Sequence, residues 1–256
     1  MKKFRIIFLI FSISLIVFCL STAGKESCSS WYIKRNGDKA PRFPAEAKVL
    51  DDYNCIYIDK KASEEGKKVI YLTFDAGYEN GNVERILDVL HSHKVPAAFF
   101  VLDNIILKNA DLVSRMTKEG HLVCNHTKNH KNLSYSSTED IKKDLEALEQ
   151  IYKNETGEEM SRFFRFPEGK YSLNSVKSVS ELGYTTVFWS FAYDDWDNCR
   201  QIDSKKAMKK IIENTHDGAI FLFHPTSKTN ADIMDDLITE WKNRGYSFGT
   251  LEDIVR

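Results

Sequence analysis

Side chains that could carry out acid–base chemistry or bind a metal ion follow almost every short apolar run of this 256-residue chain from residue 67 onward. They are Asp75 after VIYLTF, His126 and His130 after HLVCN, Arg165 within RFFRF, Asp194 and Asp195 after TTVFWS, and His224 after AIFLF. A carboxylate, two histidines, an arginine and a separate histidine are the groups that a metal-assisted hydrolase needs. Singly, each has an ordinary explanation as a turn residue, surface ion pair or core histidine. Their recurrence at one end of successive runs favours a shared site.

The spacing of His126 and His130 is that of a metal site. Four residues are about one helical turn, so both imidazoles could leave one face of a helix that opens there and converge on one ion. On spacing alone, solvated or core histidines are the more common explanation. The other candidate groups shift the balance toward a metal.

The remaining groups suggest the roles of a hydrolytic mechanism. Asp75 could take a proton from water, and His224 could return one to a leaving amine. Arg165 could hold Asp75, or an orienting acid such as Asp195, in the right ionisation state. Backbone N–H groups in the turn after Pro167 could face a developing oxyanion.

The elements that must position these groups form a regular alternation. Seven runs rich in β-branched and aromatic residues predict strands: 69–74, 97–101, 121–125, 162–166, 185–190, 219–223 and 246–250. Helical apolar stripes lie between them, and Gly120, Gly183 and Gly245 follow helices where a left-handed cap is expected. Apolar strands that alternate with helices are typical of a parallel sheet, and seven units predict an α/β fold with a closed or nearly closed barrel. A doubly wound open sheet is the alternative. Both place function at the carboxyl ends of the strands.

The N-terminal residues 1–23 are typical of an export signal. Basic residues at positions 2, 3 and 5 precede an apolar run over 6–20 and small residues that suit cleavage after Ala23. The run could instead persist as an anchor, although it is short for a membrane span. A lipoprotein signal at Cys19 is disfavoured because bulky Phe18 precedes it. Residues 24–66 are a polar, irregular leader, and 67–256 form the main domain.

Net charge and cysteine content bear on the binding partners and on the disulfide state of the chain. Removing residues 1–23 takes the formal net charge from −1 to −4, which does not favour a nucleic-acid partner. Four cysteines remain, at 28, 55, 124 and 199, without the spacing of a zinc knuckle or a redox pair. Export would permit disulfides, but a core of this size does not require them, so thiols and disulfides both stay open.

Five motifs in order resemble the polysaccharide deacetylase family, carbohydrate esterase family four. They are TFDAGYENG (73–81), NHTKNH (125–130), RFPEG (165–169), DDW (194–196) and IFLFH (220–224). The leader WYIKRNGDKAPRFP, together with TFDAGYENG and VFWSFAYDDW, resembles a narrower branch, the delta-lactam-biosynthetic de-N-acetylases of spore-forming bacteria. The likeness spans residues 67–256 and implies a deformed (β/α) barrel of about seven parallel units.

By this resemblance Asp75 is the catalytic base and His224 the catalytic acid, and His126 and His130 bind the metal. Arg165 tunes the base, and Asp195 orients the acid, with Asp194 as the alternative. The expected substrate and oxyanion pocket contains Glu168, Trp196, Leu222 and Tyr78.

The sequence departs from the family pattern at the residue after the base. Family members usually have a metal-ligating aspartate there, and this chain has Ala76. We therefore expect a weakly bound, exchangeable divalent metal, zinc in the first place, with cobalt or manganese as alternatives. Cys124 could substitute as a ligand, against the simpler reading of a buried thiol.

Two more departures are Glu168, where many relatives have tyrosine, and Ala192 in place of the first acid of the fourth motif. Tyr78, Tyr193, Trp196 and Phe166 could stack on sugars, although about half of such aromatic residues belong to a core.

The branch resemblance implies an exported enzyme, monomeric, of the cell envelope or the space between forespore membranes. Its expected partners are peptidoglycan glycan strands and an N-acetylmuramoyl-L-alanine amidase acting beforehand. Its reaction would be removal of the acetyl group from N-acetylmuramic acid, leading to the muramic delta-lactam of spore cortex. The alternatives are a peptidoglycan N-acetylglucosamine deacetylase that confers lysozyme resistance, and a wall-binding pseudoenzyme without metal.

Overall fold

The computed structural model describes residues 28–255, so the predicted export signal lies outside the described residues. Its central element is a curled sheet of eight parallel strands. Across the sheet they lie in the order β11 (Ala219–Phe223), β5 (Val69–Ala76), β6 (Ala97–Val101), β7 (Leu122–Asn125), β8 (Ser161–Phe164), β10 (Thr185–Val187) and β4 (Cys55–Ile56), while β12 (Ser247–Phe248) pairs with the start of β5.

The sheet curls back on itself after β10. The N–H groups of Ser190 and Phe191 donate to the carbonyl of Ile220 in β11, at 3.0 and 3.2 Å. The Leu222 N–H donates to Phe191 in return, at 2.9 Å. The architecture is therefore the predicted deformed (β/α) barrel and not a doubly wound open sheet.

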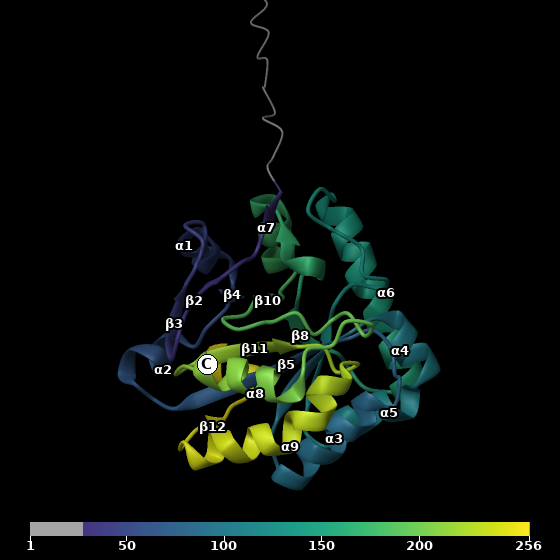
Figure 1. The fold of residues 1–256 in the computed structure, drawn as a ribbon. Helices are drawn as coiled ribbons and strands as arrows, with labels where there is room; N and C mark the ends of the chain where they lie inside the picture. The colour runs from purple at the N-terminus through teal and green to yellow at the C-terminus, as the bar shows by residue number, and fades with distance from the viewer. Residues whose placement is uncertain (1–27, 256) are drawn as a thin grey trace, which may run out of the picture.

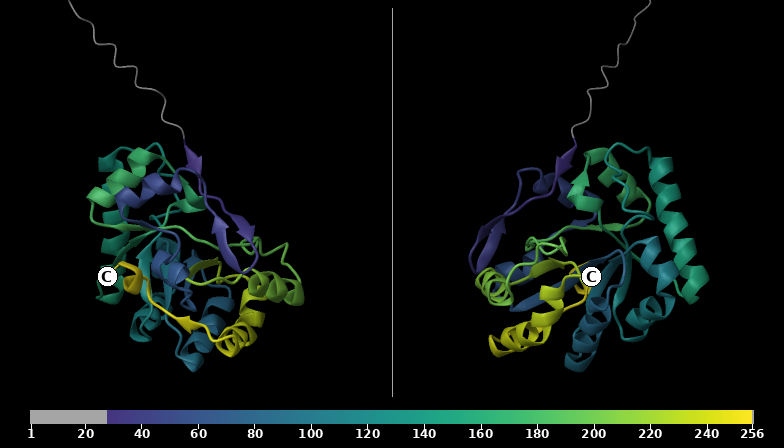
Figure 2. Two further views of the ribbon diagram at one scale, coloured as in Figure 1. Left: turned by 90° about the vertical axis from the view of Figure 1, so that its left-hand side faces the viewer. Right: turned by 45° about the vertical axis from the view of Figure 1, so that its right-hand side comes forward.

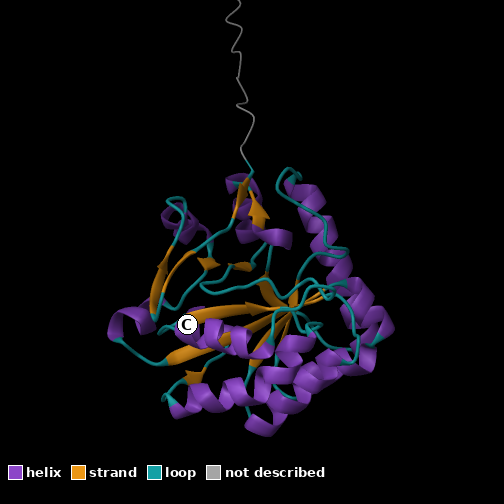
Figure 3. Cartoon of the chain, in the orientation of Figure 1, coloured by secondary structure: helices purple, strands orange, loops and turns teal. Residues whose placement is uncertain are grey.

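Helices cover the outside of the strands (Figures 1 and 3). The longer ones are α3 (Asn82–His93), α5 (Ala110–Lys118), α6 (Thr138–Thr156), α7 (Leu173–Glu181), α8 (Ser204–Glu213) and α9 (Lys228–Asn243). The shorter ones are α1 (Ala47–Leu50), α2 (Lys60–Glu65), α4 (Asp103–Lys108) and α10 (Leu251–Val255), with single 3-10 turns η1 (Asp51–Tyr53) and η2 (Pro167–Gly169). As predicted, Gly120, Gly183 and Gly245 have positive φ. No helix within residues 28–255 is long and apolar enough to cross a membrane.

The alternation of side chains along β5 positions the site. Ile70, Leu72, Phe74 and Ala76 belong to the apolar cluster with α3 and α9, whereas Val69 and Tyr71 belong to a second cluster with residues of β6, β7 and β11. Successive side chains of a strand point to opposite faces, so Thr73 and Asp75 continue the face of Val69 and Tyr71. That face is apolar at the start of the strand and polar at its carboxyl end.

From residue 28 on, the leader is part of the fold. Its residues Cys55 and Ile56 form β4, which pairs with Thr186 and Val187 of β10. Trp31 is buried, its Nε1 donates to the carbonyl of Trp189 at 2.9 Å, and its ring stacks on Phe188. Two short antiparallel pairs complete this segment: β1 (Ser29–Ser30) with β9 (Lys170–Tyr171), and β2 (Lys34–Asn36) with β3 (Lys39–Arg42). Figure 2 shows the β2–β3 hairpin along the outside of the barrel.

Candidate active site

Asp75 and Arg165 form a buried ion pair at the carboxyl end of β5. Arg165 Nη1 donates to Asp75 Oδ1 at 2.7 Å, and Arg165 Nη2 donates to Thr73 Oγ1 at 2.8 Å. Arg165 Nε donates to the carbonyl of Val187 at 3.0 Å, and the guanidinium lies 4.1 Å from the ring centroid of Phe100. Because Arg165 is fully buried and held on every side, it fixes one oxygen of Asp75 and leaves Oδ2 for other chemistry.

The electrostatics of the site keep Asp75 ionised. Burial by itself raises the pKa of Asp75, but the positive charge and hydrogen bond of Arg165, with electrostatic contributions from His126 and His224, outweigh burial. The net effect is a pKa below that of an ordinary aspartate. Asp75 is therefore a carboxylate able to accept a proton at neutral pH.

His126 and His130 lie on a loop and not on the predicted helix. His126 comes directly after β7, and the next helix, α6, begins only at Thr138. Thr127 and His130 both have positive φ, at 69° and 61°, which no helix permits. The side chain of Asn125 accepts a hydrogen bond from the Thr127 N–H at 2.9 Å, so the chain turns instead of coiling. The loop still brings the imidazoles together, with ring centroids 5.1 Å apart.

His126 has a defined tautomer. Its Nδ1 lies 2.9 Å from the carbonyl oxygen of Arg165, which can only accept, so Nδ1 carries the proton. Nε2 is then the unprotonated nitrogen, 3.5 Å from Asp75 Oδ2. Burial lowers the pKa of His126 to about 4, in spite of the opposing charge of Asp75. A neutral imidazole whose other nitrogen donates to a carbonyl is the usual state of a metal ligand.

The donor set fits a cation bound through two protein ligands. Ala76 is fully buried in the apolar cluster and offers no donor. Cys124 is a buried thiol packed with Phe100 and Ile220, and burial raises its pKa, so it does not replace the missing aspartate. Among residues 28–255, no three histidine, cysteine, aspartate or glutamate side chains are arranged to hold a metal ion. All four cysteines in this range are free thiols.

His224, at the end of β11, is oriented by Asp195. Its Nδ1 lies 2.7 Å from Asp195 Oδ1, and its backbone N–H donates to Asp195 Oδ2 at 2.8 Å. Burial lowers the pKa of His224, but the charge and hydrogen bond of Asp195, helped by Asp75, raise it above the ordinary value overall. Asp194 is exposed and takes no part, so the structure selects Asp195 from the two candidates.

These groups surround one cavity of about 630 Å³. Its lining residues are Asp75, His130, Glu168, Gly169, Trp189, Ala192, Tyr193, Trp196, Leu222 and His224. Trp196 stands at the cavity with 65% of its surface exposed, and Leu222 forms an apolar wall. The cavity therefore combines acid–base groups with apolar and aromatic surface.

Two of the predicted aromatic residues lie elsewhere. Tyr78 is not among the lining residues; it is 44% exposed, and its hydroxyl accepts a hydrogen bond from Asn198 at 2.6 Å. Phe166 is fully buried in the cluster beneath the leader. Tyr78 was predicted to belong to the pocket, and it does not line this cavity, because β5 ends at Ala76 and the chain carries Tyr78 toward the surface.

The turn η2 lies at the cavity, where Glu168 and Gly169 are lining residues. Pro167 has no N–H, and the Gly169 N–H is the first to bond within the turn, to the carbonyl of Phe166 at 3.0 Å. The Glu168 N–H lies between these two positions and is the candidate donor to an oxyanion. The Glu168 carboxylate pairs with Lys170 and has a lowered pKa because of that hydrogen bond.

Sequence reasoning missed two buried polar residues that support the site. Thr73 accepts from Arg165 and donates to the carbonyl of Phe221 at 2.6 Å. Asn230 contacts both Asp195 and His224. Thr73 could have been found, because a polar residue two positions before Asp75 lies on the same strand face.

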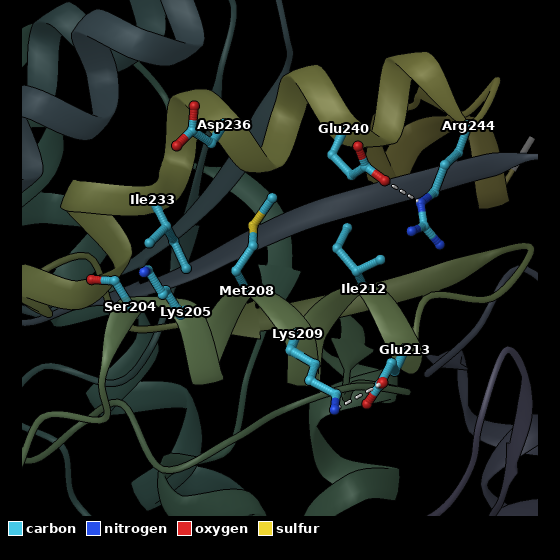
Figure 4. Close-up of a pocket in the computed structure, with 10 residues that line it drawn as sticks. All are labelled: Ser204, Lys205, Met208, Lys209, Ile212, Glu213, Ile233, Asp236, Glu240 and Arg244. Carbon is cyan, nitrogen blue, oxygen red and sulfur yellow. Dashed lines mark hydrogen bonds and ion pairs between the residues drawn. The ribbon is translucent and has the colours of Figure 1, made fainter.

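A second hollow of about 500 Å³ lies between α8 and α9 (Figure 4). Met208, Ile212 and Ile233 form its floor, and ion pairs within each helix lie at its edge. It contains none of the residues singled out from the sequence and lies on the outer, helical layer.

Comparisons with known proteins identify relatives of this chain. Residues 62–187 match the family described as polysaccharide deacetylase. The peptidoglycan-N-acetylmuramic acid deacetylase PdaA of Bacillus subtilis is 36% identical over 231 residues, 88% of this chain and 85% of the relative. A peptidoglycan-N-acetylglucosamine deacetylase of Bacillus cereus is 31% identical over 195 residues, 74% of this chain and 89% of the relative. The solved structure of Bacillus subtilis PdaA, a family 4 carbohydrate esterase, superposes with a TM-score of 0.84 at 35% identity, covering 89% of this chain and 97% of that one.

Proposed function

This chain belongs to the polysaccharide deacetylase family, and from that premise we propose that it removes the N-acetyl group from N-acetylmuramic acid in peptidoglycan. The observation that carries the proposal is the placement of Asp75 and His224 on one cavity, one held as a carboxylate and the other as a proton donor. Amide hydrolysis needs such a pair, because water must lose a proton and the leaving amine must gain one.

The residues divide the reaction between them. Asp75 Oδ2 takes the proton of the attacking water while Arg165 holds Oδ1. The Glu168 N–H donates to the oxygen of the tetrahedral centre. His224 then donates its Nε2 proton to the amine nitrogen, because Asp195 holds Nδ1. The C–N bond breaks, and acetate and a free 2-amine leave the cavity.

His126 and His130 are the residues that would hold the divalent metal on which this family in general depends. When bound, the metal polarises water and the acyl oxygen. Two imidazoles without the aspartate that Ala76 replaces support our proposal that the ion is zinc, cobalt or manganese and is weakly held.

The extent of the match supports muramic acid over glucosamine. The 231-residue match to the muramic acid deacetylase is longer than the stretch 67–256 and so includes much of the leader. The match to the glucosamine deacetylase has about the length of that stretch alone. The leader packs on Trp189, a residue of the cavity wall, so the shared region reaches the site.

The proposed place in the pathway follows from the chemistry of the product. An amidase that has removed the peptide leaves a lactyl carboxylate on the same sugar, and deacetylation supplies an amine beside it. Loss of water between them would give the muramic delta-lactam. We propose that the protein acts after such an amidase, outside the cytoplasmic membrane, where the predicted N-terminal signal would deliver it.

The test is mass spectrometry of muropeptides after incubation of the protein with amidase-treated peptidoglycan and a divalent metal, beside Asp75→Asn and chelated samples. Acetyl loss on muramic acid in the first sample only is the expected result. Acetyl loss on glucosamine would overturn the muramic assignment in favour of the lysozyme-resistance reaction. No acetyl loss with any metal would overturn the assignment as an enzyme and would favour a wall-binding protein.

A further inference from the structure

Asn230 lies beside Asp195 and His224, in the first turn of α9. The Ser227 hydroxyl caps this helix by accepting a hydrogen bond from the Asn230 N–H, which fixes the position of the Asn230 backbone. The side chain is fully buried. Its Nδ2 donates to Asp195 Oδ2 at 2.6 Å and to the carbonyl of His224 at 3.1 Å, and its Oδ1 accepts the hydroxyl of Tyr193.

The surroundings fix the orientation of this amide. The carboxylate of Asp195 and the carbonyl of His224 can only accept, so both face the NH₂ group. The hydroxyl of Tyr193 then donates to the oxygen. No other uncharged side chain of this length offers two donors on one side and an acceptor on the other, and an aspartate would place a second carboxylate against Asp195.

The contacts of Asn230 decide which oxygen of Asp195 serves His224. Oδ2 receives two donors, Asn230 Nδ2 and the His224 backbone N–H. Oδ1 is left to the imidazole Nδ1. Rotation of the Asp195 carboxylate would break both bonds to Oδ2, so the carboxylate is locked with Oδ1 toward the ring.

We propose that Asn230 is a positioning residue for proton donation by His224, acting through Asp195 and through the backbone of His224. It holds the carboxylate turned with Oδ1 toward the ring and ties that carboxylate to the strand end that carries the imidazole. The inference rests on the proposed function, since it concerns the acid of the same site. Tyr193 extends the arrangement to the cavity wall, because it both lines the cavity and orders the amide.

The charged groups that face His224 come from three elements: Asp195 after β10, Asp75 on β5 and Arg165 after β8. Asn230 is neutral and touches only the first of them. Without Asn230 the Asp195 carboxylate could rotate away from Nδ1, which would lower the proton affinity of His224. The effects of Asp75 and Arg165 on His224 would stay in place.

The test compares wild type with Asn230→Leu, which keeps the approximate volume and removes all three hydrogen bonds. We expect kcat to fall about 10- to 100-fold, the range for hydrogen bonds to a charged group, and KM to stay within a factor of two or so, because Asn230 does not line the cavity. We expect the alkaline limb of the kcat profile to move to lower pH. Thr215→Val is the matched control, since it removes a buried hydroxyl that accepts Trp241 Nε1 at 2.8 Å, away from the site.

A second measurement needs no substrate. The imidazole C–H resonance of His224, assigned by its absence in His224→Gln, is titrated by NMR in each variant. Asn230→Leu should lower the His224 midpoint, and Thr215→Val should not. A fall in kcat with an unmoved midpoint and alkaline limb would overturn the proposal and leave Asn230 a packing residue. If wild type deacetylates no glycan, the proposed function fails, and the His224 titration still shows whether Asn230 acts on Asp195.

Discussion

Asp195 receives both N–H groups of His224, the ring Nδ1–H on Oδ1 at 2.7 Å and the backbone N–H on Oδ2 at 2.8 Å. One carboxylate therefore sets the rotation of the imidazole and its proton affinity together. The distal nitrogen of the ring is left to the cavity. This relationship, with the Asp75–Arg165 pair across the cavity, separates the acid from the base, and the predictions below test the two halves.

Asp195→Asn is expected to move the alkaline limb of the pH profile to lower pH. Burial lowers the pKa of His224, and the Asp195 charge opposes it, so removing that charge lets burial prevail. A proton donor is inactive above its pKa, and activity is then lost at lower pH. We expect kcat to fall about 10- to 100-fold near neutral pH. The profile of kcat against pH measures both effects, and an unmoved limb would assign proton donation to another group.

Asp75→Asn is expected to lower kcat about 10²- to 10⁴-fold at every pH. The amide cannot take a proton from water, although it preserves the shape beside Arg165. Because the pKa of Asp75 is lowered, wild-type activity should extend below the pH at which an ordinary aspartate protonates. Asp194→Asn is the control, because it makes the same change from carboxylate to carboxamide at an exposed position. This variant should keep nearly full activity.

Chelation is expected to abolish activity, and added zinc, cobalt or manganese to restore it. Two imidazoles hold a divalent ion less firmly than the usual three-ligand set, so dialysis against metal-free buffer should already reduce the bound metal. Elemental analysis of the dialysed protein measures this. His126→Ala should prevent reconstitution, while His91→Ala, on an exposed helix end, should not. Tight stoichiometric metal after prolonged dialysis would contradict the two-ligand description.

Gly169→Ala is expected to destabilise the protein more than Gly157→Ala. Both glycines have positive φ, at 63° and 77°, which costs an L-residue about 1–2 kcal/mol. A Cβ at 169 would also lie 2.7 Å from the ring of Trp189, whereas at 157 it meets nothing within 4 Å. The clash should add about 1–3 kcal/mol and displace the turn that carries the Glu168 N–H. Urea denaturation measures the loss of stability, and kcat measures the displacement of the turn. Equal losses of stability in the two variants would rule out the clash.

Trp31→Ala is expected to lower the free energy of unfolding by about 3–5 kcal/mol. Trp31 is buried, donates to Trp189 and stacks on Phe188, so its removal opens the contact between the leader and the barrel. Tyr32→Ala, at an exposed neighbour, should change stability by about 0.5 kcal/mol or less. Similar effects of the two variants would show that the leader does not support the barrel.

The strands and the convergence of the site were predictable from sequence because they follow from repeating local patterns. The apolar runs of β5, β6, β7 and β11 are largely buried strands close to their predicted bounds, β8 is buried at its carboxyl end, and residues at these carboxyl ends meet. The prediction of a helix at His126 was wrong because the Thr127 N–H donates to the Asn125 side chain and Thr127 has positive φ, and the spacing of the histidines encodes neither feature.

The rest of the fold depends on contacts between distant positions. β4 has two residues and no periodicity, and it is a strand only because β10 lies beside it. Asn230 looks like an ordinary residue in the first turn of a helix, and its contacts with Asp195 appear only once β11 and the loop after β10 are placed together.

The pairing of β4 with β10 has a consequence for how the chain must fold. β4 is the first strand of the central sheet in chain order, and its partner residues Thr186 and Val187 are synthesised far later. The barrel therefore cannot be completed progressively from the N-terminal end. Until Cys55 and Ile56 dock, β10 presents an unpaired edge, which is a template for association between chains. By pairing with β10, the leader removes an edge at which chains could associate. A shortened chain that starts at residue 62, where the family match begins, would lack β4 and would expose this edge.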